Sequence, residues 1–366
     1  MTAPSLRAGV IGLGWAGRQH MAAYDQLEGV ELVALAGMES DQLALLGDQY
    51  GVEQRFRDWR DLISEAQIDL LSIATPTALH GPIALAALAA GVHVLSEKPM
   101  AEKADVARAM VLAARDNDRV LEVSFNHRRR GDVAALKGVV DAGLLGRVYY
   151  AKAGWLRREG IPGLDSWFTR SAMSGGGPLM DIGVHMLDMS LHLLGEPSVL
   201  TASAATYAEF GPRGKGGAPT ALAAKTGAGG GSFDVEDLAT ALLRLDGGAT
   251  LLLESSWAQW IPQDQCYVTL YGTDGGASLT WGGMAGQGYH SLDVWTEVEG
   301  VPAELKPRIG LDGGHTQCVI DFLAEVRSGS DRHRGEEGLT RALVVDACYA
   351  SAARGSEVAL GVHAGG

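Results

Sequence analysis

The chain has 366 residues, a length that allows two or three domains. Hydrophobic residues make up 46% and charged residues 20%, which excludes a disordered or collagen-like chain. The formal net charge is -14, and the longest basic run, Arg128 to Arg130, is too short to offset it. Nucleic acid is therefore not expected as a partner.

The three cysteines, Cys266, Cys318 and Cys348, are widely spaced and form no CxxC pair. We predict neither a disulfide framework nor a metal site. Residues 1–7 lack the features of an export signal, and the uncharged stretch 70–96 is interrupted by Pro and Gly. We therefore expect a cytoplasmic protein with no membrane-spanning segment.

Short apolar strands alternate with helices through the first third of the chain. Strands are predicted at 8–11, 30–36, 69–74, 92–95 and 119–124, and helices at 18–28, 39–50, 81–90 and 102–116. This alternation indicates a parallel, doubly wound sheet. Residues 1–125 are predicted to form an α/β Rossmann domain.

After residue 125 the pattern changes to longer strands that are typical of antiparallel pairing. Two predicted hairpins have short glycine turns and join 237–245 to 249–257 and 266–272 to 277–281. The other predicted elements are a strand at 147–156 and helices near 131–143, 179–194, 314–328 and 336–353. Residues 126–366 are predicted to form a second, α+β domain.

The segment 211–232 is rich in Gly and Ala and has no periodicity. We expect a surface loop. The functional alternative is a lid over a cleft, because long loops in compact domains often serve function.

The first strand leads into a GxGxxG pattern made by Gly12, Gly14 and Gly17, with Trp15 and Ala16 between them. Gly12 permits a tight turn, Gly14 leaves room for a pyrophosphate, and Gly17 allows close packing of helix and sheet. This pattern predicts a bound dinucleotide.

An acidic residue at the tip of the second strand often binds the ribose of NAD. Here Gly37 occupies the tip, and Glu39 is the candidate for the ribose contact. Because no Arg lies nearby in the sequence to neutralise a 2′-phosphate, the prediction is NAD, with NADP still open.

Two further strand ends carry polar residues. Thr75, Pro76 and His80 follow one strand, and Glu97 and Lys98 end the next. Open α/β sheets bind ligands at the carboxyl ends of their strands, so these residues are predicted to approach the nicotinamide half of the dinucleotide.

A second motif, GGGPLMDIGVH, spans residues 175–185. Asp181 and His185 are four residues apart, which places them on one face of a helix. A histidine exchanges protons near neutral pH, and a nearby carboxylate can orient it. The alternative is a helix histidine with a purely structural role.

Taken together, GxGxxG, ATPTALH, SEKP and GGGPLMDIGVH resemble the Gfo/Idh/MocA family of NAD(P)-dependent oxidoreductases. The resemblance covers most of the chain. It implies a Rossmann domain followed by a domain with a large, open, mostly antiparallel sheet. It also implies a catalytic set of Lys98, Asp181 and His185, a cis peptide before Pro99, and a homodimer or homotetramer formed through that sheet.

The reaction implied by the resemblance is hydride transfer between nicotinamide and a hydroxyl-bearing carbon of a sugar, sugar derivative or cyclitol. His185 is expected to act as general base, with Lys98 on the hydroxyl and Asp181 orienting the substrate or His185. The alternatives are an NAD-dependent glycosidase with no net redox change and a non-catalytic nucleotide-binding regulator. Candidate substrate contacts are Asn126, His127, Arg157, Trp167 and Arg170.

Overall fold

The computed structural model describes residues 5–164, 166–218, 233–284, 287–310, 313–329 and 333–361. The chain forms two compact units. The first unit comprises residues 1–129 and 313–342, and the second comprises residues 130–312 and 343–366. Residues 313–342, which follow the predicted boundary at 125, thus cluster with the N-terminal unit.

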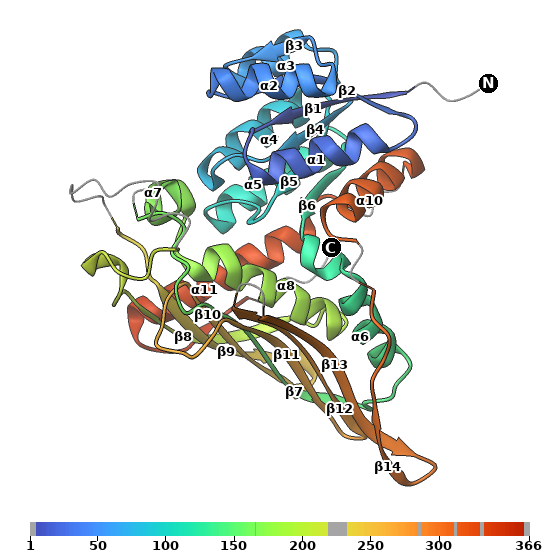
Figure 1. The fold of residues 1–366 in the computed structure, drawn as a ribbon, viewed down its shortest axis with the longest axis vertical. Coiled ribbons are helices and arrows are strands. Elements are labelled where there is room, and N and C mark those ends of the chain that lie inside the picture. Colours follow the sequence, from blue (N-terminus) through green and yellow to red (C-terminus); the bar gives the residue numbers. More distant parts are fainter. Residues whose placement is uncertain are drawn as a thin grey trace. The chain divides into compact units, whose positions relative to one another are not determined.

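The first unit is built on a six-stranded parallel sheet (Figure 1). Its order is β3-β2-β1-β4-β5-β6, which is the strand order of dinucleotide-binding folds. The strands are β1 (Leu6–Ile11), β2 (Val30–Ala36), β3 (Gln54–Phe56), β4 (Leu70–Ile73), β5 (His93–Glu97) and β6 (Leu121–Ser124). The predicted α/β fold is confirmed for this part of the chain.

Helices connect these strands. They are α1 (Trp15–Gln26), α2 (Ser40–Tyr50), α3 (Trp59–Glu65), α4 (His80–Ala89) and α5 (Ala104–Asp116), with a 3-10 turn, η1 (Thr77–Leu79), before α4. No sequence pattern predicted β3 or α3, and α1 begins three residues before the predicted helix at 18–28. The stretch 70–96 folds as strand, helix and strand, and no described helix is long and apolar enough to cross a membrane.

Helix α10 (His315–Ser328) packs against α1 although almost 300 residues separate them. Val319, Phe322 and Leu323 of α10 join Met21 and Tyr24 of α1 in one buried apolar cluster. This packing explains why a C-terminal helix belongs to the Rossmann unit.

The second unit is built on a nine-stranded sheet of order β14-β13-β12-β11-β7-β10-β9-β8-β15. Among the described strands of this sheet, only β7 and β10 pair in parallel, and the predicted hairpins β9–β10 and β11–β12 are present. The strands are β7 (Val148–Leu156), β8 (Val199–Tyr207), β9 (Leu238–Leu245), β10 (Thr250–Ser256), β11 (Gln265–Gly272), β12 (Gly275–Met284), β13 (Gln287–Val298), β14 (Val301–Leu305) and β15 (Val358–Ala359).

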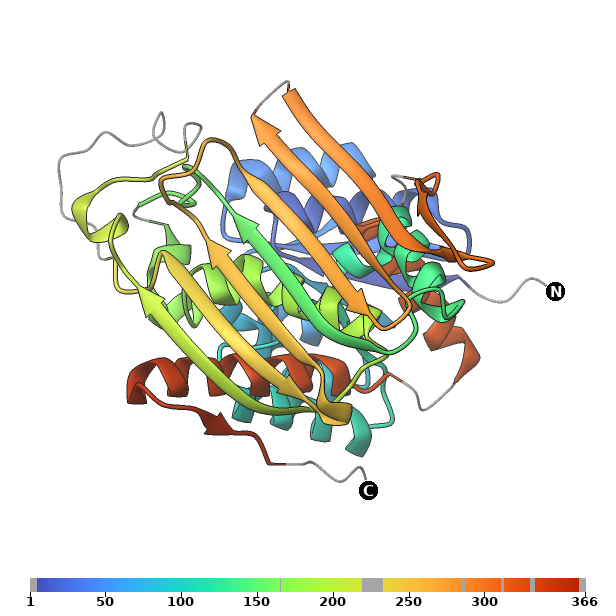
Figure 2. The same ribbon diagram turned by 90° about the horizontal axis from the view of Figure 1, so that it is seen from below.

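One face of this sheet is covered by helices, and Figure 2 looks onto the other face. The helical elements of this unit include α6 (Gly131–Asp141), α7 (Ser171–Ser174), η4 (Leu179–Gly183) and α8 (Val184–Leu193). Ala151, Ala153 and Leu253 are buried on the covered face, against η4 and α8, and alternate with half-buried residues on the open face. Helix α11 (Glu336–Arg354) begins in the first unit and ends in the second.

Candidate active site

The glycine pattern lies between β1 and α1 and shows two different uses of glycine. Gly12 has φ +106°, and a Cβ there would lie 2.1 Å from the Ala74 carbonyl oxygen. A Cβ on Gly17 would lie 1.9 Å from the Gly12 carbonyl oxygen. At Gly14, by contrast, a Cβ would meet no atom within 4 Å. Gly12 and Gly17 are therefore required by the fold itself, whereas the fold leaves open space beside Gly14.

Polar groups without a described protein partner lie at the start of α1 and in the loop after β4. Helix α1 begins at Trp15 with no side-chain cap, and no acidic residue lies in its first turn. The indole of Trp15 is 68% exposed. In the neighbouring loop after β4, the Oγ1 atom of Thr75 is buried and has no hydrogen-bond partner among the described residues. Free helical N–H groups beside an unsatisfied hydroxyl suit an anionic ligand.

His80 connects the loops that follow β4 and β5. Its Nδ1 atom lies 2.8 Å from the carbonyl oxygen of Pro99, and its Nε2 atom lies 2.9 Å from that of Thr75. Burial lowers the pKa of His80, although both carbonyls favour the protonated ring. His80 is therefore placed to hold the two loops together rather than to reach into solvent.

Glu97 ends strand β5, Lys98 follows it directly, and the Lys98–Pro99 peptide is cis. Glu97 is only 6% exposed. Its carboxylate lies 3.1 Å from Nε2 of His20 and 3.2 Å from Nε2 of His315. Burial opposes its ionisation, but these two histidines bring the pKa of Glu97 well below its ordinary value. Its carboxylate thus faces protein donors in the core.

The tip of β2 shows why an acid is absent there. A Cβ on Gly37 would lie 2.4 Å from Cδ1 of Leu13. Glu39 occupies the N-cap position of α2 without a capping hydrogen bond from its side chain, and it is exposed. The guanidinium of Arg18 reaches Gln42 on α2 and lies 3.2 Å from the Leu13 carbonyl oxygen. An arginine therefore does lie near this tip, where proximity in sequence suggested none.

Asp181 and His185 belong to a π turn followed by a helix. Residues Leu179–Gly183 form the π turn η4, and α8 continues from Val184. The indole Nε1 of Trp257 donates a hydrogen bond of 2.9 Å to Oδ2 of Asp181. The ring of His185 lies 6.0 Å from that of Trp155. The predicted continuous helix over 179–194 therefore starts with a wider turn that packs on β10.

Glu236 holds the glycine run that precedes η4. Its carboxylate accepts hydrogen bonds from the N–H groups of Gly177 at 3.0 Å and Leu179 at 3.1 Å, and from the Tyr349 hydroxyl at 2.9 Å. Burial raises the pKa of Glu236, while these donors act in the opposite direction. Sequence analysis missed Glu236; an acid at the start of an apolar strand was the signal available.

Among the candidate substrate residues of the first unit, Asn126 and His127 lie in η2 (Asn126–Arg129) after β6. Nδ2 of Asn126 lies 3.3 Å from Nδ1 of His315. The arginines that follow are not a solvated run. Arg128 pairs with Glu337 at 2.6 Å, and Arg129 contacts Glu122 and lies 2.6 Å from Asp321.

In the second unit, Arg157 stacks over Trp155 with its guanidinium carbon 5.2 Å from the ring centre. It also lines an open hollow of about 580 Å³ with Glu159 and Asp264. Trp167 stacks on Phe168 at 3.8 Å, and Arg170 is exposed. His185, Trp155 and Arg157 are thus linked by ring contacts, and Asp181 lies four residues before His185. Trp167 lies in the 3-10 turn η3 (Trp167–Thr169), and Arg170 follows it.

The glycine-rich segment 211–232 is described only in part. Residues 211–213 form a 3-10 turn, and Gly217 bridges to Ile161. Residues 219–232, on which the lid interpretation depends, lie outside the described residues.

Comparison with known proteins identifies the family. The model of the oxidoreductase family with an NAD-binding Rossmann fold matches residues 6–125, and the GFO/IDH/MocA C-terminal domain matches residues 133–278. The chain belongs to the Gfo/Idh/MocA family of oxidoreductases. D-glucoside 3-dehydrogenase of Escherichia coli K12 is 31% identical over 98% of this chain and 99% of that protein.

Two levoglucosan dehydrogenase comparisons agree with this assignment. The enzyme of Pseudarthrobacter phenanthrenivorans is 31% identical over 74% of this chain and 72% of its own. A levoglucosan dehydrogenase structure in complex with NADH has a TM-score of 0.80 at 25% identity, covering 97% of this chain and 99% of that one. The predicted family, fold class, NAD cofactor and oxidoreductase activity of this Gfo/Idh/MocA chain are confirmed.

The first unit of this Gfo/Idh/MocA chain fits the dinucleotide that its family binds. No described protein atom fills the space beside Gly14, and none forms a hydrogen bond with the buried Thr75 hydroxyl. A bound pyrophosphate needs both close approach to the backbone and hydrogen-bond donors. The residues present therefore suit the group.

Proposed function

We propose that this oxidoreductase transfers a hydride between nicotinamide and a hydroxyl-bearing carbon of a sugar, sugar derivative or cyclitol, with a D-glucoside as the first candidate. The observation that carries the proposal is the near full-length similarity to D-glucoside 3-dehydrogenase. Levoglucosan and D-apiose dehydrogenases among the relatives support a polyhydroxylated substrate.

NAD, when bound, accepts the hydride from the substrate carbon. In this proposal Lys98 donates a hydrogen bond to the reacting hydroxyl oxygen and stabilises the negative charge that develops there. His185 removes the hydroxyl proton as general base. Asp181, oriented by the Trp257 indole, positions the substrate hydroxyl or the His185 ring.

The cofactor contacts divide into two groups in this proposal. The pyrophosphate and ribose contacts come from the glycine loop and the start of α2, namely Gly12, Gly14, Trp15, Ala16, Gly17 and Glu39. The nicotinamide half contacts Thr75, Pro76 and Lys98 at the ends of β4 and β5, while His80 and Glu97, whose polar atoms bond to protein groups, hold these strand ends in place. Substrate contacts come from Asn126, His127, Arg157, Trp167 and Arg170.

A substrate panel tests the activity. Purified protein is incubated with NAD or NADP and a methyl D-glucoside, D-glucose, levoglucosan, D-apiose or myo-inositol, and reduced nucleotide is followed by absorbance. We expect turnover with at least one pyranoside and NAD. Release of the aglycone without net reduction would instead indicate a glycosidase, and nucleotide binding without any turnover would indicate a regulator.

A parallel fluorescence titration with NADH and NADPH tests the cofactor preference. We expect tighter binding of NADH, because Gly37 and Glu39 offer no positive charge at the end of β2. Tighter NADPH binding would assign a 2′-phosphate to Arg18, the arginine that reaches α2.

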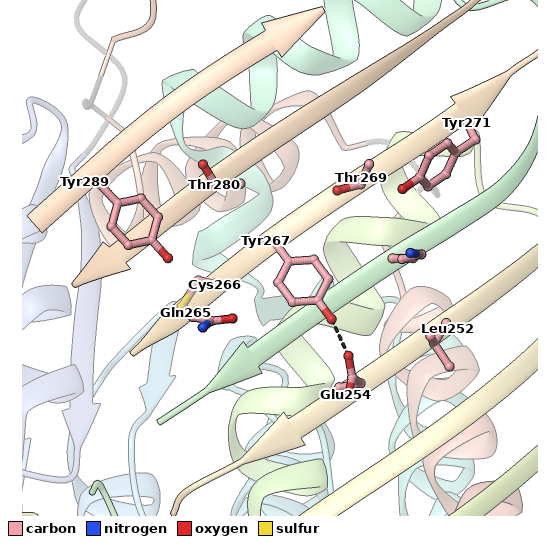
Figure 3. A pocket seen from close by; sticks show the side chains of 10 residues that line it. Leu252, Glu254, Gln265, Cys266, Tyr267, Thr269, Tyr271, Thr280 and Tyr289 are labelled. Atoms are coloured by element: carbon pink, nitrogen blue, oxygen red, sulfur yellow. Dashed lines mark hydrogen bonds between the residues drawn. The ribbon is translucent and has the colours of Figure 1, made fainter. Parts of the chain in front are cut away.

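We also propose that the open face of the nine-stranded sheet forms the contact of a homodimer or homotetramer. Figure 3 shows aromatic side chains on this face, with the Tyr267 hydroxyl hydrogen-bonded to Glu254. Tyr150 stacks on Tyr271 at 5.3 Å, and Nζ of Lys152 lies 5.6 Å from the Tyr271 ring. The Tyr271→Glu substitution places a charge among these rings. We expect light scattering of this variant to show dissociated protomers.

We also propose a cytoplasmic location for the protein and a role for each domain. The described cysteines are all free and buried, which suits a reducing cytoplasm. We propose residues 1–125 as the dinucleotide-binding domain and residues 126–366 as the domain for substrate binding and oligomerisation, with α10 of the latter segment packed on the first unit.

A further inference from the structure

A row of polar side chains crosses the buried core of the first unit beneath the glycine loop. The Tyr24 hydroxyl lies 2.9 Å from Oγ of Ser72, which lies 2.9 Å from Nδ1 of His20. Beyond His20 the row continues through Glu97 to His315. The row thus joins side chains from α1, β4, β5 and α10, and those of α1 and α10 meet at the Glu97 carboxylate.

The hydrogen bonds to Glu97 show which ring nitrogens of His20 and His315 carry a proton. A carboxylate that accepts from three donors is stable as an anion even when buried. Oε1 faces Nε2 of His20 and Nε2 of His315, and Oε2 accepts a 3.1 Å hydrogen bond from the Lys98 N–H. Since an ionised carboxylate offers no proton, both Nε2 atoms must carry one.

The remaining ring nitrogens agree with this arrangement. Asn126 presents its Nδ2 amide, a donor, to Nδ1 of His315 at 3.3 Å, so Nδ1 of His315 accepts. Burial raises the pKa of the Tyr24 phenol, so its hydroxyl keeps its proton and can donate to Ser72. Ser72 can then donate to Nδ1 of His20. Every hydrogen bond in the row has one donor and one acceptor.

The same three ligand atoms, from His20, Glu97 and His315, lie within 4.8 Å of one another and could also hold a metal ion. Two observations favour hydrogen bonds. The distances of 3.1 and 3.2 Å are ordinary for N–H···O bonds, and the second carboxylate oxygen is used by the Lys98 N–H. With the Asn126 amide oriented as in the structure, Nε2 of His315 carries the proton and has no lone pair for a metal.

We propose that His20 and His315 are positioning residues that hold the Glu97 carboxylate and, through its bond to the Lys98 N–H, fix the backbone from which the catalytic lysine extends. The inference rests on the proposed role of Lys98. His315 comes from α10, so the C-terminal helix of this unit takes part in placing a residue at the end of β5. Trp15, edge-on to His315 at 5.0 Å, connects the same row to the glycine loop.

Variants at His315 test the positioning role. His315→Leu removes the donor to Glu97, whereas His315→Gln keeps an amide N–H near the Nε2 position. We expect His315→Leu to lower kcat about 10- to 100-fold while KM and the NADH dissociation constant change less than about threefold. His315→Gln should recover at least a third of the wild-type kcat.

His93 supplies the matched control because it lies at the opposite end of β5. Its Nδ1 atom accepts a 2.9 Å hydrogen bond from the Val120 N–H. His93→Leu should lower the melting temperature but leave kcat within about twofold. Unchanged kcat in His315→Leu, or equal losses in His315→Leu and His315→Gln, would overturn the positioning role.

A second measurement does not depend on turnover. Nitrogen-15 NMR of histidine-labelled protein should show Nε2 protons of His20 and His315 that exchange slowly with solvent, each signal disappearing in its His→Gln variant. One equivalent of metal bound to the purified protein, with both Nε2 atoms unprotonated, would refute the hydrogen-bonded arrangement. If no substrate is oxidised but these protons are found, the proposed function fails and the hydrogen-bonded row stands.

Discussion

Two buried glutamates, Glu97 in the first unit and Glu236 in the second, each anchor a segment that carries a candidate catalytic residue. Glu97 binds the N–H of Lys98, and Glu236 binds the N–H groups of Gly177 and Leu179, just before Asp181. Burial raises the pKa of Glu236, whereas two histidine donors bring the pKa of Glu97 below its ordinary value.

The difference shows that burial alone does not decide the charge of a carboxyl group. Both side chains are almost inaccessible to solvent and both have three donors. Two of the donors to Glu97 are imidazole N–H groups, and their hydrogen bonds lower the pKa of its carboxyl group. The donors to Glu236 are two amides and a phenol, and they do not fully offset desolvation.

The largest expected effects are at the residues that the two glutamates help to place. Lys98→Ala and His185→Ala should each lower kcat about 10²- to 10⁴-fold, because each removes a group that acts on the reacting hydroxyl. NADH affinity, measured by fluorescence titration, should change less than about threefold. A wild-type kcat in either variant would contradict the proposed catalytic role of that residue.

Replacing each glutamate by glutamine should lower the free energy of unfolding by different amounts. In Glu97→Gln a neutral amide faces donors that stabilised an anion, and we expect a loss of about 3 kcal/mol in the free energy of unfolding. In Glu236→Gln the substitution also removes a charge whose burial was unfavourable. We therefore expect the free energy of unfolding to fall by only about 1 kcal/mol. Urea unfolding at pH 7 measures both values. An equal or larger loss in Glu236→Gln would remove the distinction between the anchors.

Two glycines, one in each unit, offer a smaller but sharper contrast. A Cβ on Gly177 would lie 2.0 Å from the Glu236 carbonyl oxygen, so Gly177→Ala should destabilise the protein by about 2 kcal/mol. A Cβ on Gly14 meets nothing, so Gly14→Ala should keep the melting temperature and weaken NADH binding about tenfold or more. Unchanged NADH affinity in Gly14→Ala would mean that the open space is not a nucleotide site.

Sequence analysis was most successful where the determining pattern is local. The alternation of apolar strands and helices gave the Rossmann unit, and glycine turns gave the hairpins β9–β10 and β11–β12. The short elements β3 and α3 were missed because three and seven residues carry little periodicity.

The supporting residues could not be predicted because they act across long separations in the chain. His20 meets Glu97 across 77 residues, and Trp257 reaches Asp181 across 76. In the sequence, His20 on α1 resembles any polar residue of an amphipathic helix. Its role follows only from the packing of α10 and β5 around it, which periodicity does not encode.

The smallest expected effect concerns Glu122, a third buried glutamate, next to Arg129 in the first unit. Burial raises its pKa from 4.5 to about 7, with Asp321 acting in the same direction and Arg129 against it. The folded protein therefore binds this proton more tightly than the unfolded chain. The stability that this group contributes is complete below about pH 4.5 and is lost as pH rises through about 7.

Glu122→Gln should therefore make the free energy of unfolding less dependent on pH between 5 and 7.5, by about 1 to 2 kcal/mol across that window. The measurement is urea unfolding at half-unit pH steps. Glu53→Gln, at an exposed glutamate, is the matched control and should leave the slope unchanged. If Glu122→Gln and the wild type show the same slope, the attraction of Arg129 outweighs desolvation, and Glu122 resembles Glu97 rather than Glu236.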